Sequence, residues 1–166
     1  MPSLANSSAA ADAPARADGA ACLQIQVGEG LPLPRRLGRL VDPIAAAVHD
    51  STRMSGVVAL RATDDDEMTR LNGAFAGKPG ATDVLAFPSG NPDCPGDVAI
   101  SLERVRSQAV AFGHGIEREF GYLLTHALLH LAGFGHGDDA EQRQMRRVEE
   151  SVMAAVGLAR DHKPVR

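Results

Sequence analysis

The sequence has few cysteines, no long apolar run and no excess of positive charge. Its two cysteines, Cys22 and Cys94, are too few for a disulfide framework. No apolar stretch approaches the ~20 residues that a bilayer-spanning helix needs. The formal net charge is −4, whereas nucleic-acid-binding domains are usually basic. These absences exclude a disulfide-stapled secreted fold and a membrane-spanning helix. Nucleic-acid binding would have to rely on local patches of positive charge.

Two arginine clusters are the candidate patches for phosphate. They comprise Arg35, Arg36 and Arg39 in one segment and Arg143, Arg146 and Arg147 in another. Clusters of this kind more often form a solvated helix face than a phosphate site, so neither one alone predicts RNA binding.

The first 21 residues contain almost no large apolar side chains and are predicted to be a disordered tail. They lack the basic start and apolar core of a secretory signal, and Asp12 and Asp18 do not suit a transit peptide. The remaining composition, within a total of 166 residues, is that of one globular domain. We therefore expect a folded domain over 22–160, a short C-terminal tail over 161–166 and a cytoplasmic location.

Periodicity and turn residues predict an α+β chain with four strands and about five helices. The strands are expected at 22–27, 56–62, 82–88 and 96–101, the last two forming a hairpin across a polar loop. The helices are expected at 35–49, from Asp64 to near Gly77 with Thr63 as N-cap, and at 102–112, 116–132 and 138–156. Strands precede most helices, which favours α+β over an alternating α/β fold.

The segment HALLHLAGFGH, residues 126–136, has the spacing of a metal site. His126 and His130 are four residues apart in a helical pattern, so both imidazoles share one helix face. Gly133 is suited to a left-handed turn that ends the helix and brings back His136. Three imidazoles without a fourth protein ligand describe an open, catalytic type of site. Zn²⁺ is the expected ion, although nitrogen ligands also bind Ni²⁺ or Cu²⁺.

Two features qualify this site. Metzincin proteases use the same histidine spacing but need a glutamate beside the first histidine, where this chain has Ala127. A protease of that type is therefore disfavoured.

Glu119 and Tyr122 fall on the same helical stripe as the histidines, with Glu119 about 10 Å from His126 along the axis. Glu119 is either a supporting or substrate-contacting group or a plain surface glutamate.

The chain resembles the YbeY endoribonucleases, a bacterial family of metal-dependent proteins in ribosomal RNA maturation. HALLHLAGFGH is similar to the family's H-G-x-L-H-L-x-G-Y-D-H signature, and LNGAFAGKPGATDVLAFP (71–88) to its L-N-x-x-Y-R-x-x-D-x-x-T-D-V-L-S-F-P segment. GDVAIS (96–101) is similar to a G-D-I-x-I-S strand, and MRRVEESVMAAVGL (145–158) to a closing M-x-x-x-E helix. The motifs occur in the family's order over about 22–160.

The resemblance implies a mixed four-stranded sheet packed against helices, with the histidine site in a cleft. It implies a zinc-dependent, single-strand-specific endoribonuclease for 16S ribosomal RNA 3′-end maturation and ribosome quality control. Its partners would be ribosomal RNA and the small ribosomal subunit, with no membrane and no DNA. His126, His130 and His136 would bind one zinc ion, and Thr82 and Asp83 would lie near the cleft.

The chain departs from the family at a position expected to hold substrate phosphate, where Ala76 replaces an arginine. Lys78 could supply a point charge but not the bidentate grip of a guanidinium. Ala86, Ala127 and Gly135 are further departures, all compatible with metal binding.

The sequence therefore does not identify the catalytic groups, and Lys78, Asp83 and His114 are the candidates. Direct hydrolysis and attack by the 2′-hydroxyl both remain possible routes of cleavage. Two other functions also stay open: a ribosome-associated RNA-binding accessory protein with a structural zinc, and a different metal-dependent hydrolase such as a peptidase or amidase.

Overall fold

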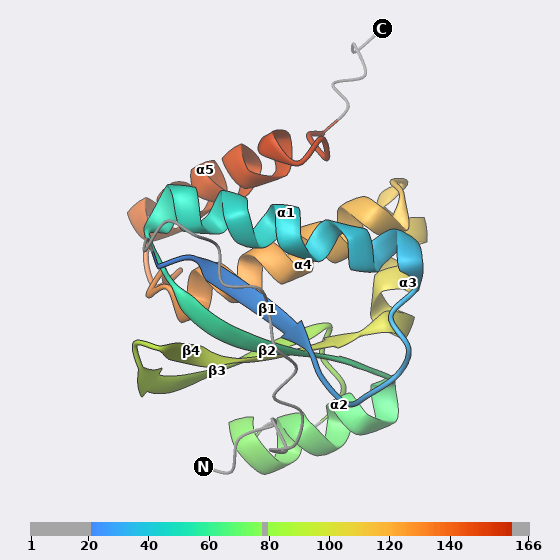
Figure 1. The fold of residues 1–166 in the computed structure, drawn as a ribbon. Coiled ribbons are helices and arrows are strands. Elements are labelled where there is room, and N and C mark those ends of the chain that lie inside the picture. The colour runs from blue at the N-terminus through green and yellow to red at the C-terminus, as the bar shows by residue number, and fades with distance from the viewer. Residues whose placement is uncertain (1–20, 78–79, 161–166) are drawn as a thin grey trace, which may run out of the picture.

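A mixed four-stranded sheet lies at the centre of the fold (Figure 1). The computed structural model describes residues 21–77 and 80–160. The strands are β1 (Leu23–Val27), β2 (Gly56–Thr63), β3 (Val84–Asn91) and β4 (Cys94–Ser101), in the spatial order β1-β2-β4-β3. β2 runs parallel to both β1 and β4, whereas β3 pairs antiparallel with β4 as the predicted hairpin. The predicted α+β class and mixed sheet are confirmed.

Helices cover both faces of the sheet, as Figure 1 shows. α1 (Arg35–Thr52), α4 (Ile116–Leu131) and α5 (Asp139–Ala155) are stacked on one side, with α3 (Leu102–Phe112) at one end. α2 (Asp65–Leu71), continued by the π-helical turn η1 (Asn72–Ala76), covers the other side. The main apolar core lies between the sheet and α1, α4 and α5, and a smaller cluster of Met68, Leu71 and Ala99 lies beneath α2.

α4 is the helix that positions the site, and its sequence explains its placement. Phe120, Leu124 and Leu128 recur at four-residue spacing and are fully buried. This apolar stripe holds one face of α4 against the core, where burying each large side chain contributes about 1.5–3 kcal/mol. The neighbouring stripe, with His126 and His130, is only partly buried. The two histidines therefore lie on a rigid element but remain accessible.

The structure changes two details of the expected elements. Asp64, not Thr63, caps α2, because its carboxylate accepts a hydrogen bond from the Glu67 amide at 2.8 Å. Thr63 is still paired with Ser101 in the sheet, and its hydroxyl donates to the Ile100 carbonyl. The expected polar loop between the last two strands is mostly strand, since pairing continues to Asn91 and resumes at Cys94.

Several expectations concern residues that are not described. The predicted tails at 1–21 and 161–166 lie outside the described residues, except for Ala21, and so does Lys78. Within the described ranges, none of the helices combines the length and apolarity that crossing a membrane requires.

Candidate metal centre

The three histidines of the 126–136 segment meet at the C-terminal end of α4. One nitrogen from each ring lies within 4.8 Å of the others. The Nε2 atoms of His126 and His130 are 3.0 Å apart, and the two rings meet edge to face. The His136 ring stacks on His126 at a centroid distance of 5.9 Å and meets His130 edge to face at 4.8 Å. The predicted convergence of these side chains is therefore present.

A short turn after α4 brings His136 to the pair. Gly133 adopts a φ of 96°, a conformation that suits glycine, and the Phe134 amide then donates to the Leu129 carbonyl at 3.0 Å. On the far side, the Gln142 side chain donates to the His136 carbonyl at 3.3 Å. His136 is thus held between the end of α4 and the start of α5.

The outer nitrogens of the two helical histidines are already engaged. Nδ1 of His126 lies 2.7 Å from a carboxylate oxygen of Glu149 on α5, and Nδ1 of His130 lies 3.1 Å from the Phe134 carbonyl. Both partners are acceptors, so each ring carries a proton on Nδ1 and presents an unprotonated Nε2 in its neutral form. This is the arrangement in which carboxylate and carbonyl groups orient metal-binding histidines.

The electrostatic environment favours the neutral form of the His130 imidazole. Burial lowers the pKa of His130, and the neighbouring charges of His126 and His136 lower it further. Tyr122 stacks on His126 with ring centroids 6.0 Å apart. Burial raises the pKa of Tyr122 to about 12, helped by the charge of Glu149 and a hydrogen bond to it. Tyr122 therefore stays a protonated phenol beside the site.

The donor set fits a borderline divalent metal. Tetrahedral ligands at 2.0–2.1 Å from zinc stand about 3.3 Å apart, close to the 3.0 Å between the two helical Nε2 atoms. Among the residues that the structure describes, these three histidines are the one group with metal-ligand chemistry at such spacing. Three nitrogens leave a coordination position open, as catalytic centres require.

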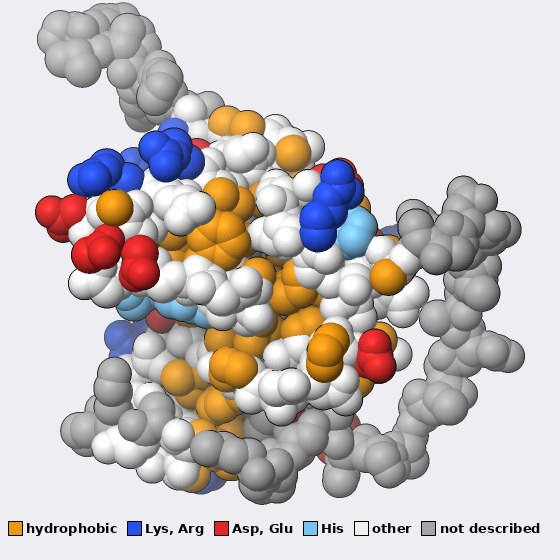
Figure 2. Space-filling model, turned by 90° about the vertical axis from the view of Figure 1, so that its left-hand side faces the viewer, with side chains coloured by type: hydrophobic (Ala, Val, Ile, Leu, Met, Phe, Trp, Pro, Cys, Tyr) orange, Lys and Arg blue, Asp and Glu red, His pale blue; other side chains and the backbone are white. Residues whose placement is uncertain are grey.

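Figure 2 shows histidine side chains at the surface of one face of the molecule, close to acidic side chains and to a band of apolar ones. Of the three clustered histidines, His136 is the exposed one, whereas His126 and His130 are half-buried. The centre is therefore most exposed to solvent at His136.

A cavity of about 380 Å³ adjoins the centre and contains several residues singled out by sequence. It is lined by His126 and His130 together with Thr82, Asp83, Val84, Ala86, Tyr122, Leu123 and Ala127. Asp83 precedes β3, and its carboxylate accepts hydrogen bonds from the Val84 amide at 2.8 Å and the Gln108 side chain at 3.3 Å. Thr82 and Asp83 therefore lie beside the histidines, as the sequence comparison implied.

His114 is not part of this cavity. It lines a second, larger one, where Nε2 lies 2.6 Å from a carboxylate oxygen of Glu119. Glu119 is 2% exposed, so the alternative of a plain surface glutamate is wrong.

Sequence reasoning assigned no role to Glu149, although it falls in the closing-helix motif. A glutamate on a helix face gives no signal of its partner until α5 is packed against α4.

Three imidazoles with an open position beside a cleft are the arrangement expected of a metal-dependent hydrolase. A family model described as "Endoribonuclease YbeY" matches residues 33–157. The chain belongs to this family, whose members are metal-dependent nucleases.

Individual relatives agree with the family match. The "Endoribonuclease YbeY" of Desulfitobacterium hafniense is 41% identical over 136 residues, covering 74% of this chain and 87% of that protein. The protein of the same name from Chloroflexus aurantiacus is 39% identical over 153 residues, covering 84% and 97%. The solution structure of TM1509 from Thermotoga maritima is similar with a TM-score of 0.57 at 25% identity, covering 87% of this chain and 99% of that one.

Proposed function

We propose that this protein is a zinc-dependent endoribonuclease that cleaves single-stranded ribosomal RNA during maturation of the 16S 3′ end. The convergence of His126, His130 and His136 beside a cleft, in a chain of the YbeY family, is the observation that carries the proposal. Its partners would be ribosomal RNA and the small ribosomal subunit, and its place of work the cytoplasm.

His126, His130 and His136 would hold the metal through one ring nitrogen each. A zinc ion there would supply Lewis acidity toward a phosphoryl oxygen and activation of water. Glu149 and the Phe134 carbonyl keep two of the rings in the required tautomer. Tyr122, protonated at neutral pH, donates its hydrogen bond to Glu149 and lines the same cavity. Asp83 is the carboxylate on the opposite wall and is our candidate proton acceptor.

The charge of the cavity explains why a metal is needed for a phosphodiester substrate. Its described lining includes Asp83 but neither lysine nor arginine. Ala76 stands where the family pattern has an arginine, and Lys78 lies outside the described residues. A bound cation therefore has to offset both Asp83 and the phosphate. Without it, RNA binding at this cleft should be weak.

The test combines metal content with cleavage of a single-stranded RNA of the 16S 3′-end sequence. Plasma mass spectrometry should find about one zinc per chain in the wild type, and His130→Ala should lose both metal and cleavage. His49→Ala is the matched control, because His49 lies on α1, contacts the carbonyl of Met54 just after that helix and lines neither cavity. The same sequence as duplex RNA and as DNA measures strand and sugar specificity, and a cyclic phosphate on the product would identify attack by the 2′-hydroxyl.

Ala76 favours one alternative, an RNA-binding accessory protein with a structural zinc. Wild type that holds zinc but cleaves no RNA, even as Ala76→Arg, would establish that alternative and reject the nuclease. Turnover of peptides or amides instead of RNA would identify a different hydrolase. No metal in the wild type would refute the site.

A further inference from the structure

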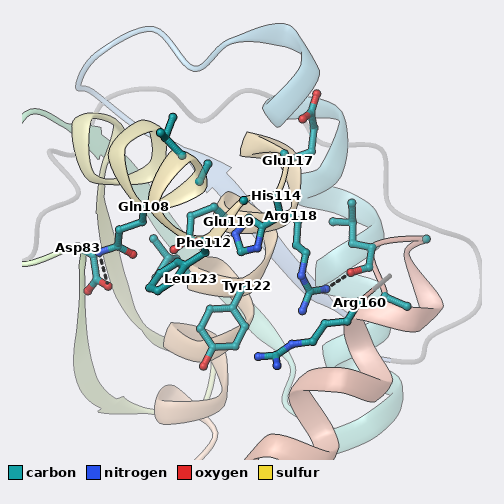
Figure 3. A pocket seen from close by; sticks show the side chains of 17 residues that line it. Asp83, Gln108, Phe112, His114, Glu117, Arg118, Glu119, Tyr122, Leu123 and Arg160 are labelled. Atoms are coloured by element: carbon teal, nitrogen blue, oxygen red, sulfur yellow. Dashed lines mark hydrogen bonds and ion pairs between the residues drawn. The ribbon is translucent and has the colours of Figure 1, made fainter. Parts of the chain in front are cut away.

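A second cavity, about 1500 Å³ in volume, adjoins the metal cleft and has no part in the mechanism above. It lies between the turn joining α3 to α4 and residues 157–160, which follow α5 (Figure 3). Asp83, Tyr122 and Leu123 line both cavities, so the two form neighbouring compartments of one surface. A chain-like ligand could occupy both at once.

The wall of this cavity carries a buried acid–imidazole pair. Glu119 is 2% exposed, and the hydrogen-bond partner of its side chain among the described residues is Nε2 of His114. Removing a carboxylate from water is costly unless its partner is well placed. The pair fixes the His114 ring, whose side chain is 26% exposed and whose Nδ1 has no hydrogen-bond partner within the described ranges. An oriented imidazole edge is therefore available to a ligand.

An exposed aromatic ring stands beside that imidazole. Phe112, the last residue of α3, is 68% exposed, and its ring centroid is 6.0 Å from that of His114. Figure 3 shows Phe112 and Tyr122 around the same opening. An exposed phenylalanine covers no core, but it offers a flat face on which a nucleobase can stack.

An arginine side chain, Arg160, lines the larger cavity near Tyr122. The Arg160 side chain is 70% exposed, and its ion-pair partner among the described residues is the partly exposed Glu150 at 3.5 Å. In Figure 3 its guanidinium lies beside the Tyr122 ring. Arg118, in contrast, donates a hydrogen bond to the Leu158 carbonyl and so stabilises the cavity wall formed by residues 157–160. Arg160 is thus the more exposed of the two arginines and the one that can turn toward a phosphate.

We propose that this cavity binds one nucleotide of the single-stranded RNA, next to the nucleotide whose phosphate lies at the metal centre. The base stacks on Phe112 and meets the edge of His114, and Arg160 faces the adjoining phosphate. The inference rests on the proposed function. Glu119 and His126 are separated by about 10 Å along α4, so His114 contacts a flanking nucleotide and not the bond that is cleaved.

The test pairs a protein variant with an RNA variant. A set of RNAs, each with one abasic position, is bound to metal-loaded wild type, and binding should weaken about fivefold or more at one position near the cleavage site. Phe112→Ala should weaken binding of the intact RNA by a similar factor and should abolish the abasic effect at that position. Leu31→Ala is the control, since Leu31 is an exposed apolar residue that lines neither cavity.

Kinetics and metal content separate a subsite from a folding defect. Phe112→Ala and His114→Gln should raise KM while leaving zinc content unchanged and kcat near the wild-type value. Arg160→Gln should reduce the salt dependence of RNA binding, because it removes one phosphate contact.

Each outcome decides between the subsite and the proposed function. RNA cleavage with an abasic profile unchanged in Phe112→Ala would overturn the subsite and leave the nuclease intact. Phe112-dependent RNA binding without any cleavage would support the subsite and reject the nuclease. Wild type that neither binds nor cleaves RNA would overturn both.

Discussion

Glu149 is the residue through which the structure makes its sharpest prediction. Its carboxylate is 3% exposed and lies 2.7 Å from Nδ1 of His126. We consider Glu149→Gln, which keeps the shape of the side chain but removes its charge. The amide can turn its NH₂ toward Nδ1, which favours the proton on Nε2 and blocks the nitrogen that would bind the metal.

The expected loss is in metal affinity, not in fold stability. A hydrogen bond to a charged group contributes about 1.5–3 kcal/mol and a neutral one about 0.5–1.5 kcal/mol. This difference of roughly 1 kcal/mol acts on the metal-free fold. The tautomer effect acts on the metal site, where outer partners of metal ligands typically change affinity 10- to 100-fold. We expect zinc binding to weaken about tenfold. The metal-free variant should not lose stability, because a buried charge has been removed.

The chain supplies its own probe for this measurement. It has no tryptophan and one tyrosine, Tyr122, which stacks on His126. Tyrosine fluorescence, titrated with zinc against a competing chelator, therefore reports directly from the site. Glu150→Gln is the matched control, since the side chain of the adjacent Glu150 is 42% exposed and pairs with Arg118 and Arg160, its ion-pair partners in the described part of the chain. Equal zinc affinity in both variants would refute the orienting role of Glu149.

Three further predictions concern the scaffold. Phe120→Ala empties a fully buried position under α4 and should cost about 3–5 kcal/mol in urea denaturation; a loss below 1 kcal/mol would contradict the assigned core. Asp138→Ala removes the α5 cap, whose carboxylate accepts a hydrogen bond from the Glu141 amide at 2.8 Å, and should lower the free energy of unfolding by about 1 kcal/mol. Zinc binding should also weaken, because His136 lies two residues before the cap. Unchanged stability and zinc affinity would argue against this coupling. Gly96→Ala would place its Cβ 2.2 Å from the Phe87 carbonyl oxygen, so it should destabilise the β3–β4 hairpin by several kcal/mol. A variant with the thermal stability of the wild type would contradict the described strand register.

The metal centre could be predicted from sequence because its geometry is local. His126 and His130 are related by one helical turn, and His136 follows within a short turn that begins at Gly133. Such relations depend on backbone geometry, which residue spacing reveals. The strands and helices were predictable for the same reason, since each carries its own periodicity.

The parts that could not be predicted depend on tertiary contacts. Glu149 meets His126 only because α5 packs against α4. Glu119 and His114 pair across a helix start, which no helical repeat specifies. The N-cap of α2 is Asp64 and not the expected Thr63, because Thr63 is still paired with β4 in the sheet. In each case, residue types suited to the role were visible in the sequence, and the missing information was their neighbour in space.

α4 links the core to the chemistry of the site through its two stripes. Phe120, Leu124 and Leu128 fix the helix against the sheet, and the adjacent stripe therefore presents His126 and His130 with little freedom. The third histidine has a different status, because His136 is exposed and is held by a turn and by Gln142 at the start of α5. Folding alone therefore positions His126 and His130, whereas a bound metal would complete the ordering of His136. It follows that metal removal should loosen the 133–138 turn and leave α4 intact.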